Sequence, residues 1–195
     1  ITTFRDEEAA YGGGQPVIGG GMEPEALKAS MLDQVKGRVS SVEGTSDEGG
    51  YDRILGGQEG NFGVKPTEMT VQSLLDFQNQ RGPGSYAAYS QDVNAKRGLF
   101  RDDGTPRIST PAGVNQAVGL NIQQMVDDGI IDPNALYNKE TQDKITEYLI
   151  ADKRGLDDYV DGNITFAELE EGLGNEFEGI AIEGLYGDDQ PTTAV

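Results

Sequence analysis

One apolar stripe near the N-terminal end of the chain constrains the fold more than any other feature. Its members follow one another at spacings of four, four, four and three residues: Leu27, Met31, Val35, Val39 and Val42. This period places them on one face of an α-helix of about five turns. Pro24 suits the first turn of such a helix, and Gly44 is typical of the position just past its end. The spacing therefore predicts a helix from residue 24 to Glu43.

The segment after this helix is rich in glycine and is predicted to turn. Residues 45–62 combine Gly, Asp and Ser with a short apolar unit at residues 54–55, which favours turns and a small β-hairpin. Periodicity predicts further helices, separated by a loop over 83–111, at residues 70–78, 114–128, 139–153 and 165–173. We therefore expect an α+β fold that is mostly helical, with a small β-hairpin element.

Glycine and charge divide the chain into three parts. Residues 1–29 contain two runs of three glycines and are predicted to form a flexible arm or linker. A folded domain is expected over residues 30–172 and an acidic tail over residues 173–195, because residues 157–195 hold eleven acids and no Lys or Arg. Since the first residue is Ile1 rather than Met, we also expect a processed product or a fragment of a longer chain.

The composition excludes several classes of function. The chain has neither histidine nor cysteine, which removes Ser-His triads, thiolate nucleophiles and zinc sites built on imidazole or thiolate. Its 34 acidic against 15 basic residues give a formal net charge of -19, which disfavours binding to nucleic acid. No apolar stretch approaches the length of a membrane span. Acid-base chemistry near neutral pH must therefore use carboxylates, Lys or Tyr.

The most informative segment is VEGTSDEGGYDRILGGQ at residues 42–58. It places Glu43 in the last turn of the predicted helix, directly before a glycine-rich turn. The negative end of the helix dipole disfavours an ionised carboxylate and raises its pKa, as a general acid requires. The alternative is that Glu43 is a solvated helix-end carboxylate like many others in an acidic chain.

The order of residues in this segment resembles that of the lysozyme-like lytic transglycosylases of phages, the lambda endolysin family. The likeness begins with E-G-T at Glu43 and Y-D-x-I-x-G-G at Tyr51. Later segments match in the same order: S-T-P-A-G-V-N-Q at 109–116, Q-D and R-G within 142–155, and D-G-N-I at 161–164. Residues 69–78 are similar to the M-T-V-x-x-L-x-x-Q helix of phage virion-associated lysozyme-like proteins. The resemblance covers about residues 30–172.

This resemblance implies a lysozyme-like fold and cleavage of the β-1,4 bond between N-acetylmuramic acid and N-acetylglucosamine in peptidoglycan. Glu43 matches the family's catalytic acid, and a lytic transglycosylase needs no second carboxylate. In a muramidase Asp47 or Asp52 is the candidate for that second role. Thr45 is a candidate for positioning substrate or water, its alternative being a turn-capping hydroxyl. The candidate substrate-binding residues are Tyr51, Asn115 and Gln116.

The resemblance also implies a setting and partners. The chain is expected in a phage virion, acting on the glycan strand of the host cell wall or periplasm during genome ejection, with its N-terminal arm bound to other virion proteins. The chain departs from the family by a shorter turn after Glu43 and by Val114 and Asn115 where the family has Arg-Tyr. The alternative function is therefore a catalytically weak or inactive structural component of a phage tail or ejection assembly.

A competing interpretation concerns metal binding near the C-terminal end. Residues 157–168 match much of an EF-hand calcium loop, with Asp157, Asp161 and Glu168 at ligand positions 1, 5 and 12. Tyr159 occupies position 3, where an Asp or Asn oxygen is expected. The lysozyme-like interpretation of the same residues requires no metal, and no other cofactor is expected.

Overall fold

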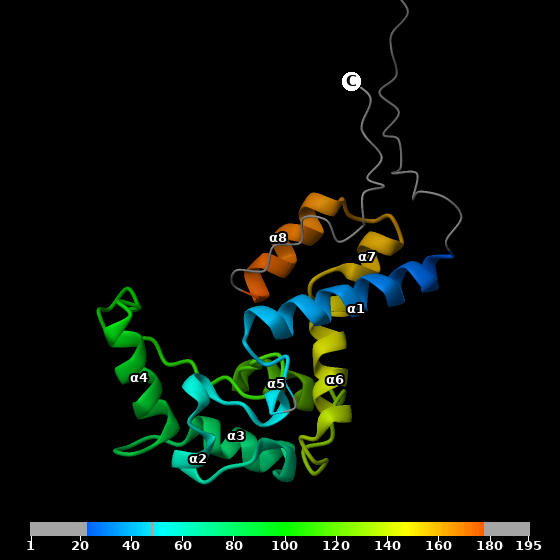
Figure 1. The fold of residues 1–195 in the computed structure, drawn as a ribbon. Coiled ribbons are helices and arrows are strands. Elements are labelled where there is room, and N and C mark those ends of the chain that lie inside the picture. Colours follow the sequence, from blue (N-terminus) through cyan, green and yellow to red (C-terminus); the bar gives the residue numbers. More distant parts are fainter. Residues whose placement is uncertain (1–22, 48, 178–195) are drawn as a thin grey trace, which may run out of the picture.

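The computed structural model describes residues 23–47 and 49–177, which form helices joined by turns and loops (Figure 1). The first half contains α1 (Pro24–Val42), η1 (Gly50–Asp52), η2 (Leu55–Gly57), α2 (Glu59–Phe62), η3 (Pro66–Glu68), α3 (Val71–Asn79) and α4 (Tyr86–Lys96). The second half contains α5 (Gly119–Asp127), α6 (Lys139–Tyr148), the π-helical η4 (Leu149–Lys153), α7 (Leu156–Val160) and α8 (Phe166–Glu176).

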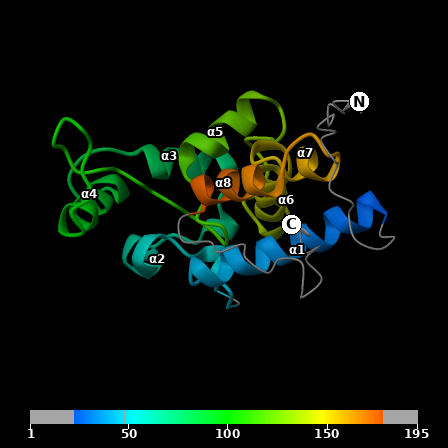
Figure 2. The same cartoon turned by 90° about the horizontal axis from the view of Figure 1, so that it is seen from above.

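The helices gather into two groups that share one hydrophobic core. α1 packs against α7 and η4, and α7 packs against α8. α3 packs against both α4 and α5. Both views show α4 and the loop after it extending away from α1, α7 and α8 (Figures 1 and 2). The predicted stripe of α1 enters the core through its first four members, whereas Val42 at the end of the helix is 49% exposed.

The predicted end of α1 is confirmed. Glu43 is the C-cap, and Gly44 adopts a left-handed conformation with φ of 67°. The N–H of Gly44 donates to the carbonyl of Ser41 at 3.3 Å, and the N–H of Thr45 donates to the carbonyl of Ser40 at 2.8 Å. This pair of bonds is a Schellman motif, which glycine favours because it lacks a Cβ.

The expected α+β class with its β-hairpin at residues 45–62 is wrong. That segment forms η1, η2 and α2, and the part of the chain that the structure describes contains isolated β-bridges but no sheet. Its glycines allow close backbone packing, since a Cβ on Gly50 would lie 1.8 Å from the carbonyl oxygen of Thr45. Ile54 pairs with the distant Ala112 instead of with a neighbouring strand. The fold is therefore all-α.

The expected loop at residues 83–111 contains α4. Ser85 caps this helix by accepting a hydrogen bond from the N–H of Ala88 at 3.2 Å. The buried face of α4 includes polar side chains that hold the following loop, because Ser90 donates to the carbonyl of Ser109 and Asn94 to that of Arg107, at 2.5 and 2.9 Å. A helix with such a mixed face lacks the apolar period used to predict the others.

The boundaries of the predicted domain fall inside helices. α1 begins at Pro24, within the expected arm, and α8 continues into the expected tail, where Leu173 and Phe177 are buried. The carboxylate of Glu176 is bound by the guanidinium of Arg154, which joins the end of α8 to the end of η4. Residues 1–22 and 178–195, most of the expected arm and tail, lie outside the described residues.

Among the described residues, no helix combines the length and the apolar character needed to cross a membrane.

Candidate functional site

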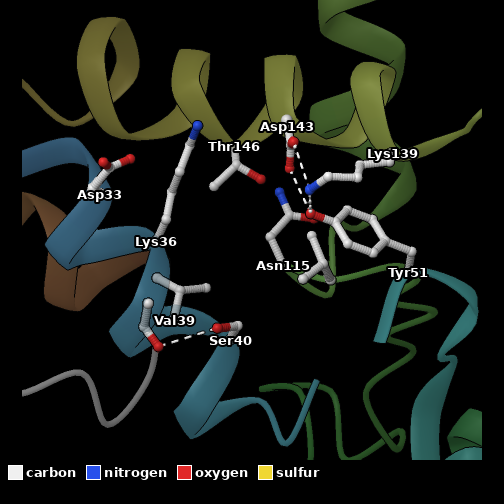
Figure 3. Close-up of a pocket in the computed structure, with 11 residues that line it drawn as sticks. Asp33, Lys36, Val39, Ser40, Tyr51, Asn115, Lys139, Asp143 and Thr146 are labelled. Atoms are coloured by element: carbon white, nitrogen blue, oxygen red, sulfur yellow. Dashed lines mark hydrogen bonds and ion pairs between the residues drawn. The ribbon is translucent and has the colours of Figure 1, made fainter. Parts of the chain in front are cut away.

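A cavity of about 290 Å³ lies between α1 and α6. Figure 3 shows its two walls, with Asp33 and Lys36 on α1 and Asp143 and Thr146 on α6. Gly37 and Ser40 extend the α1 wall towards the C-terminal end of that helix. Val39, Val114, Asn115, Tyr51 and Lys139 complete the lining. The buried Val39 and Asn115 and the half-buried Val114 are called the floor of the cavity. The floor is mostly buried while the rim is exposed, so the cavity is a surface pocket.

Three polar side chains form a connected group on the α6 side. The Tyr51 hydroxyl donates to Oδ1 of Asp143 at 2.9 Å. Nζ of Lys139 lies 2.5 Å from the Tyr51 hydroxyl, 3.1 Å from Oδ2 of Asp143 and 4.5 Å from the centroid of the Tyr51 ring. Burial raises the pKa of Tyr51, and hydrogen bonds to Tyr51 and Asp143 raise the pKa of Lys139. At neutral pH this group therefore presents a neutral phenol beside a firmly charged ammonium.

The side-chain amide of Asn115 has no hydrogen-bond partner in the part of the chain that the structure describes. Its turn is closed by two backbone hydrogen bonds of 3.0 Å between Ala112 and Ala117. The residue is only 4% exposed, yet neither its amide nitrogen nor its amide oxygen is hydrogen-bonded within the described residues. Its side chain lies between the two helices, next to Tyr51 (Figure 3). A buried unpaired polar group costs about 1–3 kcal/mol, so this amide lowers the stability of the fold.

The buried side chain of Gln142 holds this turn in place. Its Oε1 accepts from the backbone N–H of Val114 at 2.9 Å, and its Nε2 donates to the carbonyls of Tyr51 and Tyr137 at 2.8 and 2.9 Å. Gly113 leaves room for it, since a Cβ there would lie 2.2 Å from Oε1. One amide thus positions both Tyr51 and the turn that carries Asn115.

Glu43 lies next to this cavity along α1. It is half-buried and is the C-cap of the helix. Lys36 and Ser40 line the cavity, and Glu43 follows them at the i, i+4, i+7 spacing of one helical face. From Ser40 to Glu43 the helix advances about 4.5 Å. Glu43 therefore occupies the same face as the cavity wall, one turn beyond it.

Three other candidate residues have structural partners and do not line the cavity. Thr45 is buried, and its hydroxyl donates to the carbonyl of Val114. Oδ1 of Asp52 accepts from the backbone N–H of Thr67 at 2.8 Å. Gln116, with φ of 48°, donates from its amide nitrogen to the carbonyls of Gly113 and Arg53 at 2.8 and 3.3 Å. Of the six candidates the structure brings Tyr51 and Asn115 together, with Glu43 one turn away.

Sequence reasoning did not select the charged residues of the cavity. Lys36, Lys139 and Asp33 belong to no motif, and in a chain with so many charged residues nothing in the sequence distinguishes them. Asp143 belongs to the Q-D pair of the resemblance, and that pair was the one available signal for Gln142 and Asp143. The α1 wall could have been found by extending the face of Glu43 backwards in steps of three and four residues.

The residues of the calcium interpretation are not arranged as a binding loop. Asp157 lies in α7, where its Oδ1 is 2.7 Å from Nζ of Lys28. Glu168 accepts from the N–H of Thr165 at 2.7 Å in a capping box at the start of α8, and this bond lowers the pKa of Glu168. Across residues 23–47 and 49–177, no group of three or more acidic side chains is arranged to hold a metal ion. The EF-hand interpretation therefore does not fit.

No protein-family model, curated protein or solved structure matches the chain.

Proposed function

We propose that the protein cleaves the β-1,4 bond between N-acetylmuramic acid and N-acetylglucosamine in peptidoglycan, with Glu43 as the catalytic acid and base. The observation that carries this proposal is the position of Glu43. It caps α1 on the face that lines a polar cavity, one turn past Ser40. A half-buried carboxylate at the negative end of a helix, beside a cavity with room for a sugar, meets the requirements of a general acid.

The reaction needs only this one carboxylate. Protonated Glu43 gives its proton to the glycosidic oxygen as the bond between that oxygen and C1 of the muramic acid breaks. The C6 hydroxyl of the same sugar then attacks C1, and the Glu43 carboxylate takes the hydroxyl proton. The products are a 1,6-anhydro end and a free 4-hydroxyl, and Glu43 returns to its protonated form. Charge at the oxocarbenium-like transition state develops next to the carboxylate, which stabilises it.

The structure favours a lytic transglycosylase over a hydrolase. A hydrolase needs a second carboxylate to activate water or to attack the sugar. Asp52 accepts the Thr67 N–H, and both oxygens of Asp47 lie within 3.0 Å of the Arg53 guanidinium. Both nearby candidates are therefore held by structural partners.

The proposed setting is a phage virion that opens the host cell wall during genome ejection. This part rests on the order of the motifs at residues 43–58, 69–78, 109–116 and 142–164, which resembles that of phage transglycosylases.

Digestion of purified peptidoglycan by the wild type, Glu43→Gln and Glu170→Gln tests the proposal. Glu170 is an exposed residue of α8 and serves as the matched control. Wild type and control are expected to release anhydro-ended fragments detectable by mass spectrometry, while Glu43→Gln is slower by about 100-fold or more. Equal activity of Glu43→Gln would remove Glu43 from the mechanism. Inactivity of all three folded proteins would favour the structural virion component.

A further inference from the structure

The two charged residues on the α1 wall of the cavity, Asp33 and Lys36, lack partners of opposite charge. Neither side chain makes a hydrogen bond or an ion pair within the described residues. On the α6 wall, by contrast, Nζ of Lys139 lies 3.1 Å from Oδ2 of Asp143, so these two charges neutralise each other. The α1 wall therefore offers one free positive and one free negative charge to a ligand that enters the cavity.

Both charged groups can be reached from solvent. Lys36 is half-buried, but its Nζ atom, which has no hydrogen-bond partner among the described residues, remains accessible. Asp33 is exposed. Figure 3 shows the Lys36 side chain extending from α1 towards α6, with Asp33 beside it on the same wall. A ligand in the cavity can therefore contact the Lys36 ammonium and the Asp33 carboxylate directly.

This pair of opposite charges selects the chemistry of the ligand. A phosphate or a divalent cation would be attracted by one of the two groups and repelled by the other. A group that carries an ammonium and a carboxylate together can pair with both, because its carboxylate meets Lys36 while its ammonium meets Asp33. The free end of a diamino acid can carry this combination.

The distance from Glu43 indicates how such a group is connected to a glycan strand. Lys36 and Asp33 precede Glu43 by seven and ten residues and lie towards the same face of α1. At 1.5 Å per residue, these separations are about 10 Å and about 15 Å along the helix. In peptidoglycan the peptide stem is attached to the muramic acid, and three extended residues span about 10 Å. The third residue of the stem, a diamino acid, can therefore reach the α1 wall when the muramic acid lies at Glu43.

We propose that the α1 wall of the cavity binds the third residue of the peptide stem and prefers a diamino acid whose free end carries both an ammonium and a carboxylate. Lys36 binds the carboxylate and Asp33 binds the ammonium. meso-Diaminopimelate has both groups, whereas lysine at the same place in the stem has the ammonium alone and pairs only with Asp33. This inference rests on the proposed function, which places the muramic acid at Glu43.

Three muramyl tripeptides that differ only at the free end of the third residue test the two contacts. The first contains meso-diaminopimelate, the second its derivative acetylated at the free amino group, and the third L-lysine. None contains a β-1,4 bond, so binding is measured without cleavage. Each is titrated into the full chain while backbone amide shifts are followed by NMR. The first is expected to bind at least about threefold more tightly than either of the others, because each of those lacks one ion pair.

Each contact has a variant that removes one preference and leaves the other. In Lys36→Gln the diaminopimelate and lysine ligands should bind equally, while the preference over the acetylated ligand remains. Asp33→Asn should show the reverse. Lys65→Gln and Asp102→Asn remove the same charges from exposed positions outside the cavity and should keep both preferences. Lys36→Met provides a second test if Lys36→Gln does not fold.

The outcomes separate this inference from the proposed function. Equal affinity of the wild type for the three ligands, binding of none at millimolar concentration, or unchanged preferences in folded Lys36 and Asp33 variants would each overturn the stem site, even if peptidoglycan is cleaved. The expected preferences together with no Glu43-dependent cleavage would support the stem site and overturn only the catalytic proposal.

Discussion

The side chain of Gln142 accepts a hydrogen bond from the backbone N–H of Val114 at 2.9 Å, and this contact joins α6 to the turn that carries Asn115. The same amide donates to the carbonyls of Tyr51 and Tyr137. Both polar atoms of this fully buried side chain are therefore hydrogen-bonded. These bonds hold the turn at the floor of the cavity in place.

Gln142→Leu is expected to destabilise the protein strongly. The substitution leaves one N–H and two carbonyls buried without this partner, and each such group costs about 1–3 kcal/mol. We expect the free energy of unfolding, measured by urea denaturation, to fall by about 3 kcal/mol or more. Gln72→Leu, an exposed position on α3, is expected to change it by less than about 0.5 kcal/mol. Similar losses from both variants would contradict the role of Gln142.

Asp52 is expected to act on stability and not on the chemical step. Asp52→Asn keeps an oxygen that can accept the Thr67 N–H, whereas Asp52→Ala leaves that N–H unpaired and should cost about 1 kcal/mol. After correction for the folded fraction, both variants should cleave peptidoglycan as the wild type does. A folded Asp52→Asn protein that lost cleavage would make Asp52 the second carboxylate of a hydrolase.

Gly37 is expected to lower the stability of α1 while keeping the cavity open. It lies inside α1 and lines the cavity, and a Cβ there would meet no atom within 4 Å. Gly37→Ala should raise the free energy of unfolding by about 0.5–1 kcal/mol, as should Gly174→Ala, an equally open position on α8. Their leucine variants should differ, because Gly37→Leu fills the cavity and slows peptidoglycan cleavage while Gly174→Leu does not. Equal cleavage by both folded variants would contradict a role of the cavity in glycan binding.

Stability is expected to fall at alkaline pH because of two buried tyrosines. Burial raises the pKa of Tyr137 and of Tyr86 above the ordinary value of 10.0. Above about pH 10 the unfolded chain releases these phenol protons while the folded chain keeps them, so the free energy of unfolding declines as pH rises and is unaffected below that range.

Tyr137→Phe isolates one of these contributions. The Tyr137 hydroxyl donates to the carbonyl of Ala112 at 3.0 Å, so the variant should be about 1 kcal/mol less stable at neutral pH. Its decline above about pH 10 should be shallower than that of the wild type, as urea denaturation at several pH values can show. An equally steep decline would mean that Tyr137 does not contribute to the loss of stability at alkaline pH.

Periodicity predicted the helices whose buried face is apolar. The stripe of α1 and its stop at Gly44 were correct, as was the helix after Thr70, whose hydroxyl accepts from the N–H of Ser73 at 3.1 Å. Periodicity missed α4, because buried Ser90 and Asn94 interrupt its apolar pattern. It also gave the wrong class at residues 45–62, since glycine permits a close backbone approach as readily as a hairpin turn.

The functional site was harder to predict from the sequence than the fold was. Glu43, Tyr51 and Asn115 could be named from local order, but their relation depends on α6, which begins 88 residues after Tyr51 and 24 residues after Asn115. Whether the amide of Asn115 is paired depends on which distant groups surround it. The same holds for Asp52, whose partner Thr67 follows it across two intervening helical turns. Such pairings are set by tertiary packing and leave no periodic trace in the sequence.

The balanced charge of the cavity lining separates two effects of ionic strength. The whole chain carries a formal net charge of -19, so added salt should speed its encounter with an anionic polymer by screening their repulsion. Inside the cavity, two lysines face two aspartates, and an uncharged sugar experiences little change when salt is added. Salt should therefore alter how fast the protein reaches an anionic cell wall while leaving the affinity of its cavity for a neutral glycan almost constant.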